Sequence, residues 1–179
     1  MLLSLWLPIV LSAVALFFAS FLSWTVLPFH KRDWVKLANE DEILKTARAI
    51  NLAPGNYMFP GCATKDEMNS PEHRQKWEQG PRGVMTVFSG MNMGQNLALT
   101  FTYFLVISFC IAYLSTLALP RGASFMQVFR FVSTAGLLIF LSAIVQHAIW
   151  FRCRIVGHVI ESIAYAAIVG TIFGALWPT

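Results

Sequence analysis

The chain has 179 residues, of which 56% are hydrophobic and only 12% are charged, and its mean hydropathy is +0.60. Charged residues make up about 25% of an average soluble protein, so this composition excludes most soluble classes and indicates an integral membrane protein. The net charge of +4 does not indicate a nucleic-acid partner, because the polar segment 28–96 contains nearly as many acidic as basic residues. We therefore expect the lipid bilayer, and no nucleic acid, as the main environment.

Four apolar segments each reach the length of about 20 residues that a membrane-spanning helix needs. Their apolar residues do not alternate with polar ones, which favours helices over the strands of a barrel. The sequence predicts an all-α four-helix bundle in the membrane, with a small mixed α/β cytoplasmic cap between the first two helices. The predicted parts are residues 1–29 (first helix), 30–95 (cap), 96–119 (second helix), 125–151 (third helix) and 154–177 (fourth helix).

Basic residues are distributed unevenly between the two ends of the predicted helices. Lysines and arginines cluster in 30–95 and in the turn 151–154, whereas the opposite end has only Arg121, with Arg130 just inside it. The positive-inside rule therefore predicts a cytoplasmic 30–95 loop and two termini outside, as in a bacterial inner membrane. The first apolar run has no basic residue before it and is too long for a signal peptide, so we expect a retained helix.

The loop between the first two helices contains recognisable helix starts. Asn39 followed by Glu42 resembles a capping box and predicts a helix over 40–50. Ser70, followed by a proline at the first helical position, predicts a second helix up to Gln79. Two short extended segments are expected on either side of this second helix, at 56–59 and 84–88.

Two of the predicted membrane helices carry small residues at a spacing of four. Small side chains on one stripe let helix backbones approach closely in hydrocarbon. Two interpretations stay open: contact with other membrane-protein subunits or a second copy of the chain, and packing within one chain. The stripes are Ala15, Ala19 and Ser23 in the first helix, and Ser162, Ala166, Gly170 and Gly174 in the last.

The residues most suggestive of chemistry lie around the turn between the last two helices. Glu161 is the only carboxylate in the long apolar segments, and His158 precedes it by three residues, on the same helix face. His147 lies at a similar depth on the other side of the turn, and Tyr165 continues the stripe of Glu161. An ionisable side chain inside a membrane segment is costly, so these four residues are our candidates for a catalytic site.

Three interpretations of this cluster are open. His147, His158 and Glu161 could hold a divalent metal ion as two imidazoles and one carboxylate. His158 and Glu161 could instead relay a proton or a ligand. In the third interpretation Glu161 is hydrogen-bonded and simply joins two helices, which requires no cofactor. We expect the structural role, and we expect the other histidines, His30 and His73, to be solvated.

The sequence contains no P-loop, serine elbow, dinucleotide fingerprint or zincin motif, so no reaction is indicated. We expect a non-enzymatic accessory or scaffold subunit of a membrane complex, contacting other membrane-protein subunits or a second copy through the small-residue stripes and the cap. The alternative is a membrane-embedded enzyme, or a proton or small-solute carrier, that uses the two histidines and Glu161.

Overall fold

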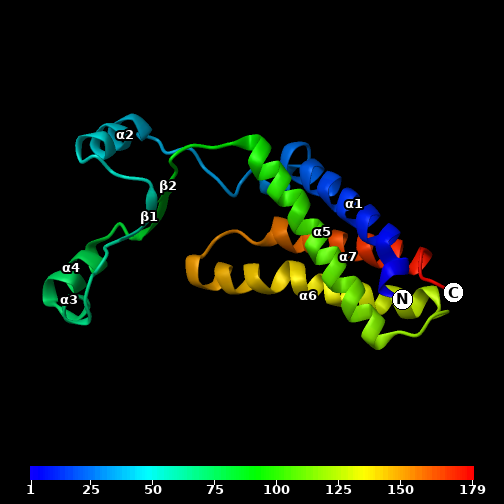
Figure 1. The fold of residues 1–179 in the computed structure, drawn as a ribbon. Helices are drawn as coiled ribbons and strands as arrows, with labels where there is room; N and C mark the ends of the chain where they lie inside the picture. The colour runs from blue at the N-terminus through cyan, green and yellow to red at the C-terminus, as the bar shows by residue number, and fades with distance from the viewer. The chain divides into compact units, whose positions relative to one another are not determined.

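The computed structural model describes all residues from 1 to 179, and 69% of the chain is helical. The chain forms two compact units (Figure 1). The first, which we call the helical unit, comprises Met1–Val35 and Met93–Thr179. The second, the loop unit, comprises Lys36–Asn92. Most of the segment predicted as a cap, 30–95, lies in the loop unit, but residues 30–35 and 93–95 belong to the helical unit. The two units are described separately.

Four helices of the helical unit are long and apolar enough to cross a membrane. This confirms the predicted number of such segments. They are α1 (Trp6–Thr25, continuing the 3-10 turn η1 at Leu2–Leu5), α5 (Met93–Ala118), α6 (Phe125–Phe151) and α7 (Val156–Ala175). A second 3-10 turn, η2 (Pro28–His30), follows α1.

Local sequence explains where α6 begins and ends. Its first turn is closed by a capping box, in which the Ser124 hydroxyl accepts from the Gln127 backbone N–H and the Gln127 side chain accepts from the Ser124 N–H. At its other end Arg152 adopts a left-handed conformation with φ of 51°, which stops the helix. The chain then reverses, and α7 packs along α6 (Figure 1).

The interior of the helical unit is built where α7 packs against α6 and α1, and where α5 packs against α1. Because each helix buries only one stripe, large apolar side chains remain exposed on all four of them. Fully buried side chains at the centre include Leu16, Ile111, Val132, Val169 and Phe173.

The small-residue stripe of α7 faces α6. A Cβ atom placed on Gly170 would lie 3.0 Å from the Phe129 ring, and one on Gly174 would lie 2.7 Å from the Phe125 ring. Ser162 and Ala166, on the same stripe, are also buried within the chain. The α7 stripe thus has the contacts expected of internal packing. In the α1 stripe Ser23 is buried, and Ala15 and Ala19 are partly buried.

The loop unit holds three short helices and one small sheet. The strands β1 (Gly55–Phe59) and β2 (Gly83–Val87) pair antiparallel, with Tyr57 opposite Met85. Both strands lie close to the segments predicted to be extended. The helices are α2 (Glu40–Ala49), α3 (Lys65–Asn69) and α4 (Pro71–Gln79).

Helix starts in the loop unit agree only partly with the expected caps. The Ser70 hydroxyl accepts from the His73 N–H, as predicted for α4. Asn39 makes no side-chain cap bond to α2, so the predicted capping box there is wrong. An unpredicted pair caps α3 instead, because Thr64 accepts from the Glu67 N–H and Glu67 accepts from the Ala63 N–H.

Candidate functional site

The first component of the site is His30, which the chain folds back against α7. Pro28 follows the end of α1, Leu27 before it is extended, and η2 then turns the chain. The Asp33 N–H donates to the His30 carbonyl at 3.0 Å and closes this turn. The His30 side chain is thereby placed against α7, and the residue is only 6% exposed. The expectation that His30 is solvated is therefore wrong.

His30, His158 and Glu161 form a cluster, which we call the His–Glu cluster. One side-chain ligand atom from each of the three residues lies within 4.8 Å of the others. The Glu161 Oε2 atom is 3.2 Å from His30 Nε2 and 3.8 Å from His158 Nδ1. His158 and Glu161 reach this point together because positions three apart share a helix face. The turn after α1 and the first turns of α7 thus contribute to one group of donor atoms, in which His30 and Glu161 are buried and His158 is partly exposed.

The His30 imidazole is held on three sides. Its Nδ1 atom is 2.6 Å from Asp33 Oδ2, and its ring stacks on Trp24 at 3.9 Å with an interplanar angle of 2°. Its edge lies against Gly157, where a Cβ atom would come within 2.8 Å of His30 Cε1. Only glycine leaves room for the ring at this position. The direction of Nε2 is consequently set before any ligand binds.

The Nε2 atom of His30 is buried and has no hydrogen-bond partner. Glu161 Oε2 is near enough at 3.2 Å, but the geometry of the two groups is not that of a hydrogen bond. Buried polar atoms are nearly always satisfied, and an unsatisfied one costs about 1–3 kcal/mol. His30 Nε2 thus lies beside a carboxylate and a second imidazole without forming a hydrogen bond, and its lone pair is available to a ligand.

Glu161 has one satisfied oxygen and one that faces the imidazoles. The Tyr165 hydroxyl donates to Glu161 Oε1 at 3.0 Å, and both residues are buried. This bond leaves Oε2 as the atom that approaches His30 and His158. Tyr165 thus orients the carboxylate and does not itself reach the imidazoles in the cluster.

The outer side of the cluster carries a second charged pair. Arg154 Nε lies 3.7 Å from Asp33 Oδ1, with the arginine side chain 56% exposed. A small cavity of about 120 Å³ lies beside this pair. Its lining residues are Phe29, Asp33, Arg154, Val156, Gly157 and Ile160. Polar groups therefore continue outward from His30 to the surface.

His147 is not part of the cluster. Its side chain is exposed, and its ring lies 4.5 Å from that of Phe151, one turn further along α6. The position of His147 along α6 does not determine which way its side chain points, and in the structure the side chain is exposed. His30 was missed because it lies outside the apolar segments. The available signal was Pro28, which places His30 just beyond the end of α1, near the turn that holds Arg154.

Two imidazole nitrogens and one carboxylate oxygen are ligands that suit zinc and related divalent transition metals. Donors bound at about 2.0–2.1 Å in a tetrahedron lie roughly 3.3 Å from each other. The two separations from Glu161 Oε2, 3.2 and 3.8 Å, are close to this value, and all three ligand atoms lie within 4.8 Å of one another. Three protein ligands would leave a fourth position for water or another ligand. The metal set suggested by the structure thus has His30 where the sequence suggested His147.

Comparison with known proteins adds no assignment: no protein-family model matches the chain, and neither curated proteins nor solved structures gave a significant match.

Proposed function

We propose that this chain is an integral membrane protein that binds a divalent transition-metal ion through His30, His158 and Glu161. The single observation that carries the proposal is the buried His30 Nε2, which forms no hydrogen bond although it lies 3.2 Å from Glu161 Oε2. A metal ion between the three side chains satisfies this nitrogen and balances the buried carboxylate. The ligand set belongs to the class that keeps an open coordination position.

The exposed apolar surface of the helical unit supports a place in the membrane. Large apolar side chains face outward on all four long helices, for example Phe18, Phe109, Leu138 and Ile163. A soluble protein rarely exposes apolar patches of this extent, whereas a bilayer requires them. The helices also satisfy their backbone groups internally, as lipid demands.

The arrangement of the helix ends supports a topology in which 30–95 and the turn 151–154 share one side. The ion pair between Asp33 and Arg154 joins the segment after α1 to the start of α7. The excess of basic residues on these segments favours the cytoplasm. Both termini and the 119–124 connection then lie outside, and the Trp177 indole bonds the Pro120 carbonyl at that end.

Two natural cysteines allow this topology to be tested. Cys62 and Cys153 are exposed free thiols, one in the loop unit and one in the α6–α7 turn. In intact cells carrying Cys110→Ser, a membrane-impermeant maleimide is expected to label neither thiol, and to label both after lysis. An added cysteine, Thr179→Cys, serves as the outside control and is labelled in intact cells. Labelling of Cys62 and Cys153 from opposite sides would contradict the topology.

Metal binding is tested on the purified protein in detergent. We expect one Zn²⁺ or Co²⁺ ion per chain, and an affinity loss of more than about 100-fold in Glu161→Gln, since this change removes a direct ligand. Isothermal titration gives the Zn²⁺ affinity, and the visible spectrum of bound Co²⁺ reports its coordination. His30→Gln is expected to behave like Glu161→Gln.

His147→Ala is the matched control, because it removes an exposed imidazole near the same turn. Its Zn²⁺ affinity is expected to equal that of the wild type. The metal-binding proposal would be refuted if the wild type bound Zn²⁺ and Co²⁺ no more tightly than Glu161→Gln does. A loss of Zn²⁺ affinity in His147→Ala would refute it as well.

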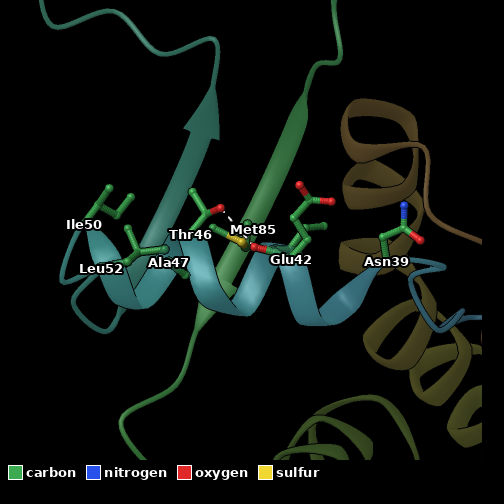
Figure 2. A pocket seen from close by; sticks show the side chains of 8 residues that line it. Asn39, Glu42, Thr46, Ala47, Ile50, Leu52 and Met85 are labelled. Atoms are coloured by element: carbon green, nitrogen blue, oxygen red, sulfur yellow. Dashed lines mark hydrogen bonds between the residues drawn. The ribbon is translucent and has the colours of Figure 1, made fainter.

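An accessory or scaffold role in a membrane complex is the second candidate function. It is favoured by an open apolar groove on the loop unit, which lies between α2 and Met85 of β2; Figure 2 shows α2 passing in front of the strands. Ile43 and Ala47 of α2 line the groove together with Ile50 and Leu52, which follow the helix, and Met85 of β2. Such a groove suits the apolar face of an amphipathic helix from the cytoplasmic part of another membrane-protein subunit.

The change Ile43→Asp tests the accessory role. It places a charge in the groove and is expected to prevent binding of the partner subunit. The tagged protein is solubilised from its own membranes and run on a native gel, where the variant is expected to migrate with the mass of the chain alone in detergent. Lys45→Asp is the control, because it changes charge on the same helix outside the groove. An unchanged mass for Ile43→Asp, or an equal effect of Lys45→Asp, would count against the groove.

A further inference from the structure

Asp33 and His30 form a buried pair that restricts how His30 can bind a metal. The distance between His30 Nδ1 and Asp33 Oδ2 is 2.6 Å, and the two side chains are 4% and 11% exposed. An ionised carboxylate only accepts hydrogen bonds, so Nδ1 must carry the proton of this bond. In the neutral imidazole the other nitrogen, Nε2, then presents a bare lone pair.

This lone pair has a consequence for the His–Glu cluster. His30 Nε2 and Glu161 Oε2 are 3.2 Å apart, and when both are acceptors they repel each other unless a cation lies between them. The two atoms are at ion-pair distance, but Nε2 forms no hydrogen bond to Glu161. The pairing with Asp33 therefore prepares His30 to coordinate a metal.

The Asp33 carboxylate is itself fixed by several contacts. Its backbone N–H donates to the His30 carbonyl at 3.0 Å, which ties the two residues into one turn. Its second oxygen, Oδ1, faces Arg154 Nε at 3.7 Å. The two carboxylate oxygens thus have different partners.

We propose that Asp33 is a positioning residue that holds His30 in the Nδ1–H tautomer and directs Nε2 at the metal ion. This inference rests on the metal-binding function proposed above. Metal-bound histidines almost always donate their other N–H to a carboxylate, a carbonyl or water, and loss of that partner typically lowers affinity 10–100-fold. Asp33 supplies this partner from the turn after α1, and Arg154 lies beside it in the turn between α6 and α7.

The first test compares Zn²⁺ affinity in position 33 variants. Asp33→Ala removes the acceptor and is expected to weaken Zn²⁺ binding about 10–100-fold. Asp33→Asn keeps an acceptor oxygen without the charge, so a smaller loss is expected. Asp41→Ala, which removes an acidic residue from α2, is the control and leaves the affinity unchanged. Equal Zn²⁺ affinity in the wild type and Asp33→Ala would overturn the inference while leaving the metal site in place.

The second test needs no metal. Nitrogen-15 NMR of the histidine rings distinguishes the two tautomers, and the His30 signals are assigned by their loss in His30→Gln. We expect the Nδ1–H form in the metal-free wild type and a shift toward Nε2–H in Asp33→Ala. An Nε2–H form in the wild type would overturn the role of Asp33. Wild-type protein that shows the Nδ1–H form but binds no Zn²⁺ would refute the metal function, and with it the inference.

Discussion

Replacing Gly157 by alanine is expected to abolish metal binding while the helices remain folded. The new Cβ atom would lie 2.8 Å from His30 Cε1 and 2.9 Å from the Phe29 carbonyl oxygen. Contacts this short do not occur, and the second involves backbone, so η2 must move away from α7. His30 would leave the cluster, and we expect a loss of Zn²⁺ affinity of more than about 100-fold, as for removal of a ligand.

The Gly157→Ala change separates a local from a global effect. Alanine is favoured over glycine in a helix by about 1 kcal/mol, so α7 itself should not be weakened. Zn²⁺ titration measures the loss, circular dichroism checks the helices, and the His30 ring signals report its displacement. Gly90→Ala is the control, because a Cβ atom there would meet nothing within 4 Å. Wild-type Zn²⁺ affinity in Gly157→Ala would show that His30 is not a ligand.

Replacing Gly170 by leucine is expected to give a large loss of stability. A Cβ atom on Gly170 already approaches the Phe129 ring to 3.0 Å and Ser133 Cβ to 3.1 Å, and leucine adds three further carbon atoms. Overpacking of a tight interior typically costs about 1–3 kcal/mol. For a chain of this length, this lowers the melting temperature by roughly 3–10 °C.

Thermal unfolding in detergent measures the effect of Gly170→Leu. The control is Ala167→Leu, which adds the same side chain on an exposed face of α7. Its melting temperature is expected to stay within about 2 °C of the wild type, since surface substitutions usually change stability by less than 0.5 kcal/mol. Equal destabilisation by both changes would mean that the contact between α6 and α7 does not determine the stability.

The long helices could be predicted because their signal is local. A run of about 20 apolar residues is helical wherever it meets lipid, and residues 125–151 predicted α6 with the bounds that the structure has. Short polar helices are harder to predict from sequence, because the residues that cap helices also favour turns. The T-x-x-E pattern at Thr64 was present in the sequence and α3 was not predicted, whereas the similar pattern at Asn39 makes no cap bond.

Two of the three residues of the His–Glu cluster could be predicted on the same local basis. Glu161 stood out as a carboxylate in an apolar segment, and the spacing of three brought His158 with it. Tyr165, four residues after Glu161, lies on the same helix face as predicted, and its hydroxyl donates a hydrogen bond to Glu161. Each of these relations lies within α7 and needs no knowledge of the other helices.

The sequence by itself determined the apolar helices, the basic ends and the unusual acid in α7, because each is a property of neighbouring residues. Only the tertiary structure decided which imidazole faces Glu161. His147 and His30 both lie near the same end of the helical unit, but the rotation of α6 turns one outward, and the turn after Pro28 folds the other inward. Such rotations follow from side-chain packing between segments far apart in the chain, at Gly157 and Gly170 above all.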